Sequence, residues 1–332
     1  MKPSLPLCLI SFSYYHLMSS LVVYGDSYSD LHAESKRTNG PVWSQVLAEQ
    51  WNAKLISFAR SGARICPSSN PKSSWLKKQV DESLLSIEKG SIHAIFLGTT
   101  DLVVAKGNTQ SRNKEWIGCI EDQVTAILEK DPEARILILG APALEFSPFG
   151  QKHKDQLKDN IMSFKVDLEE KVEEWKGQDK NIEFYDTYLM FSNLLGDPSE
   201  AKITNVDDAY WDKCQGQCND EMNQYLWWDS LHMTGAGHIA MAKEIASFDF
   251  FGIKASEPIS ILTEAEDTVD NNSHNGSNLS QNYIQCLSWL LLGCVFMMII
   301  YSFRHSRFIT SLKSKLHSKT SRLYRNKDYT LV

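Results

Sequence analysis

The chain has 332 residues, of which 42% are hydrophobic and 23% are charged. This balance excludes a disordered or fibrous protein, and the length is enough for one or two globular domains with a substantial core. The net charge of -7 gives no electrostatic support to nucleic-acid binding, so we expect no nucleic-acid partner.

Residues 1–20 predict a signal peptide, because one lysine is followed by a short apolar run. No Ala-x-Ala cleavage motif is present. A strand-like segment begins by Leu21, so cleavage is expected near Ser19 or Ser20. The alternative is that this segment is retained as the lead-in to the first strand.

Between residues 21 and 252, short β-branched apolar runs alternate with longer segments of helical period. This pattern is typical of a parallel sheet covered by helices on both faces. It predicts one doubly wound α/β domain with a flavodoxin-like, five-stranded parallel sheet, whose ligands bind beyond the carboxyl ends of the strands. The predicted strands are Leu21–Gly25, Lys54–Phe58, His93–Leu97, Arg135–Leu139 and Ile182–Tyr185. The predicted helices are Val42–Trp51, Trp75–Glu88, Trp116–Leu128, Asp155–Trp175 and Gly237–Phe248.

Two polar motifs, far apart in the sequence, together indicate nucleophilic catalysis. Gly25-Asp26-Ser27-Tyr28-Ser29-Asp30 follows the first predicted strand, and Asp229-Ser230-Leu231-His232 precedes the last predicted helix. A serine hydroxyl is a poor nucleophile until a base takes its proton, and a carboxylate can orient that base. Either motif alone is ordinary turn or helix-cap chemistry. Together they predict Ser27 as nucleophile, His232 as base and Asp229 as orienting acid.

These motifs resemble the blocks of the GDSL or SGNH serine esterases and lipases, in the expected order. The glycine of the second block corresponds to Gly62 in Phe58-Ala59-Arg60-Ser61-Gly62-Ala63. The resemblance covers about Leu21 to Phe251 and implies the SGNH hydrolase fold and ester hydrolysis without a metal or organic cofactor. Asn39-Gly40-Pro41-Val42-Trp43 and Trp51-Asn52-Ala53 are similar to the fungal branch related to carbohydrate esterase family sixteen, which contains many acetylesterases.

The third block departs from the family pattern Gly-x-Asn-Asp, because it is Gly98-Thr99-Thr100-Asp101 here. The resemblance implies an oxyanion hole formed by the backbone N–H groups of Ser27 and Gly62, with Thr100 in place of the family asparagine. Loss of one such donor costs about 2.7–4 kcal/mol of transition-state stabilisation. We therefore expect lowered activity, and a binding domain that has lost turnover is the alternative.

The predicted substrate is a carbohydrate or other small molecule that carries an acetyl or short acyl ester. Hydrolysis of lipid or thioester acyl groups at the membrane is the alternative. We expect pocket walls in the loops 106–114 and 145–154, and Trp227 and Trp228 are candidates for the floor of a substrate groove. Four histidines lack partners at metal-ligand spacing and are predicted to be surface or packing residues: His32, His93, His153 and His238.

The C-terminal part predicts a membrane anchor. Residues 253–283 form an acidic, polar linker with three N-glycosylation sequons, at Asn271, Asn275 and Asn278. Residues 284–303 contain no charge and are long enough to span a bilayer, and residues 304–332 are basic. We expect a single-pass type I protein of the secretory pathway or cell surface, with a cytoplasmic tail. A buried core helix at 284–303 is the alternative.

Four of the seven cysteines lie in the domain expected to be lumenal: Cys66, Cys119, Cys214 and Cys218. An even number is typical of a disulfide-bonded domain. Three pairings are open, and we favour 66–119 with 214–218. A metal site at Cys214 and Cys218 is the weaker alternative, because no nearby His or Cys pair completes a zinc site.

Overall fold

The computed structural model describes residues 19–31, 37–70, 72–86, 88–178, 180–215, 217 and 221–256. The predicted signal peptide, the three sequons, the membrane span 284–303 and the basic tail lie outside these residues and stay predictions. Among the helices that are described, none is both long and apolar enough to cross a membrane.

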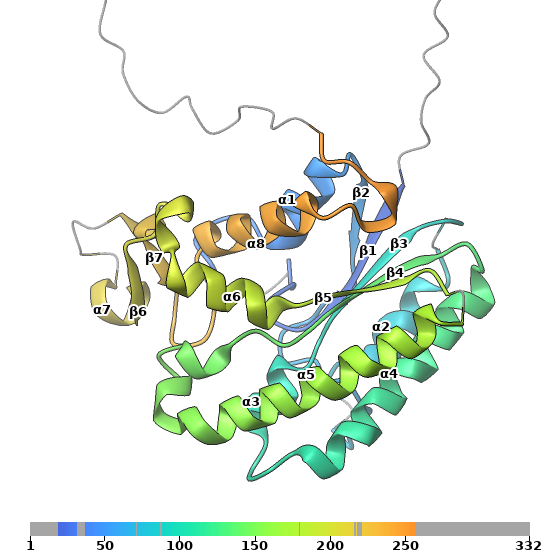
Figure 1. The fold of residues 1–332 in the computed structure, drawn as a ribbon, viewed down its shortest axis with the longest axis horizontal. Helices are drawn as coiled ribbons and strands as arrows, with labels where there is room; N and C mark the ends of the chain where they lie inside the picture. The colour runs from blue at the N-terminus through green and yellow to red at the C-terminus, as the bar shows by residue number, and fades with distance from the viewer. Residues whose placement is uncertain are drawn as a thin grey trace, which may run out of the picture. The chain divides into compact units, whose positions relative to one another are not determined.

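Five parallel strands form the central sheet, in the order β2-β1-β3-β4-β5 (Figure 1). The predicted flavodoxin-like sheet is therefore confirmed. Each boundary lies within one residue of its prediction. The strands are β1 (Ser20–Gly25), β2 (Lys54–Ser57), β3 (Ile92–Phe96), β4 (Arg135–Leu139) and β5 (Ile182–Tyr185).

Helices cover both faces of this sheet (Figure 1). On one face α1 (Trp43–Gln50) packs against α8 (Gly235–Ser247), which also contacts α6 (Thr187–Gly196). On the other face α4 (Gln110–Lys130) lies between α2 (Leu76–Ser83) and α5 (Lys154–Lys176). The short helix α3 (Thr99–Val104) follows β3 and contacts α5.

These layers form because apolar residues recur along the sequence at the spacing that each strand or helix needs to bury them. Strands β1 and β3 are buried along their whole length, as expected of a strand covered on both faces. Helix α4 buries residues three or four positions apart, which places them on one face of the helix. Trp116 of α4 meets Phe164 of α5 edge to face, with ring centroids 5.6 Å apart.

Several elements were not predicted, and apart from the ten-residue helix α6 they are short or polar. They include α7 (Tyr210–Cys214) and a two-stranded parallel sheet of β6 (Asn205–Ala209) and β7 (Tyr225–Trp227). Helix α2 ends at Ser83, earlier than predicted, where the Ser83 hydroxyl donates to the backbone carbonyl of Val80. Single 3-10 turns are η1 (Leu144–Phe146), η2 (Gly150–His153), η3 (Pro198–Ala201), η4 (Met222–Gln224) and η5 (Phe250–Gly252).

One of the two predicted disulfides is confirmed. Cys66, which follows β2, is bonded to Cys119 of α4, and their Cα atoms are 5.5 Å apart. Cys214 is disulfide-bonded. Cys218 lies outside the described residues, so the pairing of Cys214 with Cys218 stays a prediction.

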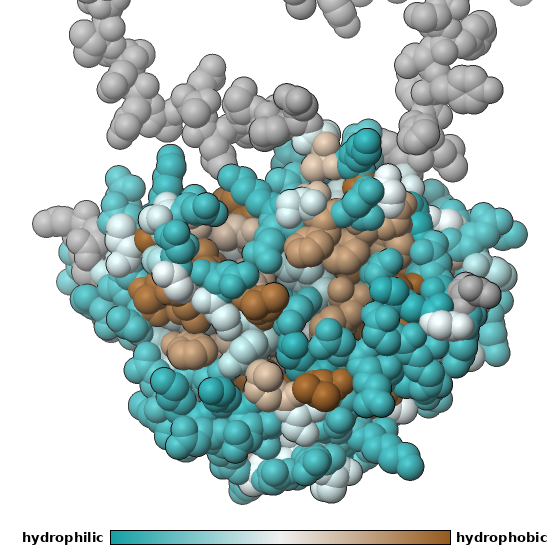
Figure 2. Space-filling model, in the orientation of Figure 1, coloured by the Kyte–Doolittle hydropathy of each residue, from teal (hydrophilic) through white to brown (hydrophobic). Residues whose placement is uncertain are grey.

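Figure 2 shows a face with a mostly hydrophilic periphery, on which apolar residues gather in separate patches. Leu189 of α6 and Phe248, just after α8, are each about half exposed. Scattered apolar residues of this kind are ordinary on the surface of a folded domain.

Candidate active site

The loops that carry the predicted site residues begin side by side, because three neighbouring strands end together. Gly25 at the end of β1 pairs with Phe96 at the end of β3. On the other side, the Arg60 N–H donates to the Gly25 carbonyl at 3.0 Å. The segments containing Ser27, Gly62 and Thr100 therefore leave one edge of the sheet, where this class of fold binds its ligands.

Gly25 allows the turn that presents Ser27. A Cβ atom on Gly25 would lie 2.7 Å from the side chain of Ser29 and 3.0 Å from the backbone oxygen of Phe96, so no larger residue fits. Gln79 of α2 holds the same residue from the other side. Its amide donates to the Gly25 carbonyl and its oxygen accepts the Gly25 N–H, both at 2.9 Å.

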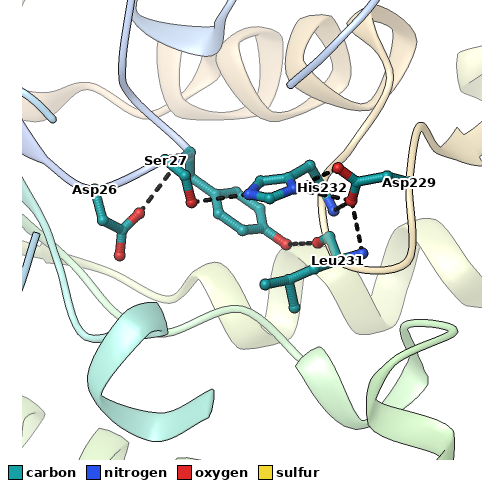
Figure 3. A network of polar contacts seen from close by, with 6 residues as sticks. Asp26, Ser27, Asp229, Leu231 and His232 are labelled. Atoms are coloured by element: carbon teal, nitrogen blue, oxygen red, sulfur yellow. Dashed lines mark hydrogen bonds and ion pairs between the residues drawn. The ribbon is translucent and has the colours of Figure 1, made fainter. Parts of the chain in front are cut away.

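Ser27, His232 and Asp229 form a continuous chain of hydrogen bonds (Figure 3). The distance from Ser27 Oγ to His232 Nε2 is 2.9 Å. His232 Nδ1 lies 2.8 Å from both carboxylate oxygens of Asp229. The structure thus brings together the three residues that the two sequence motifs predicted, although 205 positions separate the serine from the histidine.

Asp229 is arranged to remain a carboxylate. Its Oδ1 atom also accepts the backbone N–H groups of Leu231 and His232, both at 2.8 Å. Burial acts to raise the pKa of Asp229, but the hydrogen bonds from the ring and backbone of His232 outweigh it, and the pKa is lowered. An ionised Asp229 accepts a hydrogen bond from the N–H group at Nδ1 of His232. Nε2 then carries no proton, so it is the hydrogen-bond acceptor that faces Ser27. This geometry allows the imidazole to take the serine proton.

Tyr28 joins the serine turn to the histidine loop, a role that the sequence did not reveal. Its hydroxyl donates to the backbone carbonyl of Leu231 (Figure 3). Its ring also packs against His232, with centroids 5.7 Å apart. Because Tyr28 directly follows Ser27, this one side chain fixes the distance between the serine and the histidine.

Three buried aspartates support the loops around the site. Asp30 accepts the Ser61 N–H at 2.7 Å, next to Gly62, and Asp101 accepts the Ile65 N–H at 3.0 Å. Asp26 accepts the Tyr28 N–H at 3.1 Å. All three lie inside the motifs, but their function as acceptors for loop N–H groups becomes visible only once the loops are placed.

The predicted oxyanion-hole residues lie in the expected loops. Gly62 has a φ of +74°, a backbone conformation that favours glycine. Thr100 is the second residue of α3, and its backbone N–H acts to lower the pKa of Asp26, the residue before Ser27. Their roles at an oxyanion stay predictions.

A pocket of about 230 Å³ opens beside Ser27. Its other lining residues are Asp30, Leu31, Arg37, Thr38, Asn39, Gly40, Val42, Gln45 and His238. The described residues that form this pocket lie at 27, 30–31 and 37–45 and at His238 of α8, whereas the sequence predicted its walls at 106–114 and 145–154. The second of these loops does contact the histidine loop, because the Phe149 N–H donates to the Ser230 carbonyl at 2.8 Å.

The prediction that Trp227 and Trp228 form the floor of a substrate groove requires correction. Trp227 does not line this pocket: it is fully buried, and its indole N–H donates to the Val206 carbonyl at 2.8 Å. Trp228 stacks on Tyr210 instead. His238 is a packing residue, as predicted, but it also lines the pocket. Its spacing from Met241, Ala242 and Ile245 places it on the buried face of α8, which is a signal that the sequence carried.

The structure gives no indication of a metal centre within the residues it describes, where no group of three or more His, Cys, Asp or Glu side chains is placed to hold an ion.

Comparison with known proteins identifies the family. The model of the GDSL-like Lipase/Acylhydrolase family matches residues 21–245. The chain therefore belongs to this family, and it is a carboxylic ester hydrolase. No curated protein matches the chain.

Several solved structures are similar to this chain at low sequence identity. The carbohydrate acetylesterase Est24 from Sinorhizobium meliloti is 13% identical, covers 69% of this chain and 99% of its own, and has a TM-score of 0.45. A catalytic mutant of Axe2, an acetylxylan esterase from Geobacillus stearothermophilus, is 14% identical, covers 69% and 93%, and has a TM-score of 0.43. A family two carbohydrate esterase from Clostridium thermocellum is 11% identical, covers 68% and 62%, and has a TM-score of 0.42.

The buried Asp26 carboxyl predicts a measurable pH dependence of stability. Burial raises the pKa of Asp26 to about 7, against the opposing effect of the backbone N–H groups of Tyr28 and Thr100. A carboxyl with a raised pKa stabilises the fold below its unfolded pKa and loses that contribution as the pH rises toward its folded value. Relative to wild type, Asp26→Asn should therefore gain stability between pH 4 and pH 8, by at most ~4 kcal/mol.

The measurement is urea unfolding of both proteins across this range. The control is Asp81→Asn, which removes a half-exposed carboxylate from α2. A stability difference between Asp26→Asn and wild type that does not change with pH would show that Asp26 titrates normally in the folded protein.

Proposed function

We propose that the chain hydrolyses carboxylic esters through an acyl-enzyme on Ser27. His232 Nε2 accepts the proton as the serine oxygen attacks the ester carbonyl, and the resulting imidazolium then protonates the departing alcohol. Water, activated by the same nitrogen, releases the acyl group as a carboxylic acid and regenerates Ser27. Asp229 holds the imidazole and stabilises its charged form. The observation that supports this proposal is the continuous Ser27–His232–Asp229 hydrogen-bond chain.

The oxyanion of the tetrahedral intermediate is held by the backbone N–H groups of Ser27 and Gly62. The Thr100 hydroxyl assists in place of the asparagine that the family pattern has at this position. A threonine hydroxyl is shorter than an asparagine amide, so the third hydrogen bond is weaker or passes through a water molecule.

The proposed substrate is an acetyl or other short acyl ester of a carbohydrate. The pocket beside Ser27 supports this choice, because its volume of about 230 Å³ is below the usual range of about 300–1,000 Å³ for drug-sized ligands. Most of its lining residues are polar. Such a pocket favours a small, hydroxyl-rich group over the long apolar chain of a lipid or a fatty thioester.

The first test compares wild type with Ser27→Ala on p-nitrophenyl esters from acetate to palmitate, using the full chain. We expect wild type to prefer acetate or butyrate and Ser27→Ala to lose at least a thousandfold in kcat, because the acyl-enzyme cannot form. Labelling of Ser27 by a fluorophosphonate, followed by mass spectrometry, is the second readout.

Each other outcome selects an alternative. A preference for palmitate would replace the short-acyl substrate with a lipid or thioester. If folded wild type and Ser27→Ala are equally inactive and the probe does not label Ser27, the proposal is wrong and a non-catalytic binding domain takes its place.

The threonine at position 100, where the family pattern has asparagine, gives a second test. It measures kcat/KM for the ester that wild type hydrolyses fastest. We expect Thr100→Asn to raise this value, up to the hundred- to thousandfold that one oxyanion donor contributes. Thr100→Val keeps the shape of the side chain without its hydroxyl and should lower the value. If Thr100→Val has wild-type activity, the threonine hydroxyl takes no part in catalysis.

We also propose that the domain acts in the secretory pathway or at the cell surface, anchored by residues 284–303. The Cys66–Cys119 disulfide supports this location, because structural disulfides form in oxidising compartments. Treatment of the chain from its native cells with an N-glycosidase should increase its electrophoretic mobility. Replacement of Asn271, Asn275 and Asn278 by Gln should abolish that change, and an unmodified wild-type chain would contradict a glycosylated linker.

A further inference from the structure

Most polar side chains around the pocket beside Ser27 already have partners within the protein. The Asn39 side chain accepts the Gly235 N–H at 2.8 Å and donates to Asn223 at 2.9 Å. The Gln45 oxygen accepts the Val42 N–H at 2.9 Å, where it caps the first turn of α1. Asp30 is engaged by the Ser61 N–H. These groups hold the pocket in shape, and bonds within the protein already occupy part of their hydrogen-bonding capacity.

Two side chains of the same pocket, Arg37 and His238, differ from these because each has a buried nitrogen that makes no hydrogen bond. Nε of Arg37 and Nδ1 of His238 are both buried and have no hydrogen-bond partner in the structure. Within the described residues, Arg37 forms no ion pair. A buried polar atom without a partner is costly, and native proteins retain such atoms mainly where a ligand or water completes them.

The His238 ring is held in place by packing alone. It is 3% exposed, and Tyr28 meets it edge to face with centroids 6.4 Å apart. Burial, and to a lesser extent the nearby His232, lowers the pKa of His238 to about 3. The ring is therefore neutral at working pH, and it offers a fixed, uncharged hydrogen-bonding group next to the Arg37 charge.

We propose that Arg37 and His238 bind an anionic group on the substrate of the Ser27 esterase, such as a sugar carboxylate or phosphate. This inference rests on the proposed function, because it concerns the alcohol part of the same ester. A planar guanidinium matches the geometry of both anions, and hydrogen bonds between ionised partners are about twice as strong as neutral ones. The neutral imidazole adds a hydrogen bond to the same group or to a neighbouring hydroxyl.

The Asp30 carboxylate also lines the pocket and opposes an anion there. Within the described residues Asp30 forms no ion pair with Arg37, and it accepts the Ser61 N–H. The charge of Arg37 therefore remains available to a ligand.

The test uses acetylated sugars that differ in the charged or neutral group at one position. Acetylated methyl glucuronoside carries a carboxylate, and the corresponding glucuronamide is neutral. Acetylated methyl glucoside 6-phosphate tests whether the anionic group is a phosphate. We expect wild type to favour an anionic ester over the neutral one by 10- to 100-fold in kcat/KM, on the order of one charged hydrogen-bonding pair. Arg37→Gln should remove this preference, because it lowers kcat/KM for the anionic esters more than for the neutral one.

Three further variants sharpen the result. Arg37→Lys keeps the charge without the planar fork and should retain part of the preference. His238→Phe keeps the packing on Tyr28 without either nitrogen and should weaken the anionic esters at least as much as the neutral one. The control Lys114→Gln removes one positive charge from an exposed position of α4 and should leave the preference intact.

Binding separates this proposal from the proposed hydrolysis. Calorimetry measures the dissociation constants of the same esters for the full-length Ser27→Ala chain with and without Arg37→Gln, so it requires no turnover. A preference for the anionic ester that depends on Arg37 supports the anion site even if no ester is hydrolysed. Equal affinity for charged and neutral esters, or an equal loss for both in Arg37→Gln, overturns it.

Discussion

The hydrogen bond from the Tyr28 hydroxyl to the Leu231 carbonyl holds the two halves of the site together. It joins residues 203 positions apart, and it lies between the serine turn and the loop that carries His232. A serine and a histidine act together only when their separation is fixed within a few tenths of an ångström. Tyr28 provides this constraint because it is adjacent to Ser27 in sequence and packs on His232 in space.

The site also depends on buried carboxylates that take no part in the chemistry. Asp26, Asp30 and Asp101 each accept a backbone N–H from a loop at the end of the sheet. Burial is unfavourable for these charges, and it raises the pKa of Asp101 to about 6. They are retained because an irregular loop leaves N–H groups that no strand or helix satisfies. Acids of the two motifs therefore make different contacts, since Asp229 is hydrogen-bonded to the His232 ring and Asp30 supports a turn.

The sequence predicted the sheet well because its strands are short apolar runs between longer helical periods. All five strands lie within one residue of their predicted positions. Elements whose formation depends on tertiary contacts were missed. Strand β6 has the sequence Asn-Val-Asp-Asp-Ala, which has no apolar alternation, and it forms because it pairs with β7. Helix α6 begins at an Asp186 cap that accepts the Leu189 N–H, a signal that was present but not recognised.

The same distinction separates the chemistry of the site from its recognition of a substrate. Ser27, Asp229 and His232 belong to contiguous motifs, and their functions follow from residue type and spacing. The significance of Arg37 and His238 depends on something that no local pattern encodes, namely that their neighbours already have partners while they do not. An arginine on a loop is ordinary in a sequence. It becomes informative when the fold buries its Nε in a pocket beside Ser27, because the unmet hydrogen-bonding capacity of a pocket indicates the chemistry of a ligand that fits it.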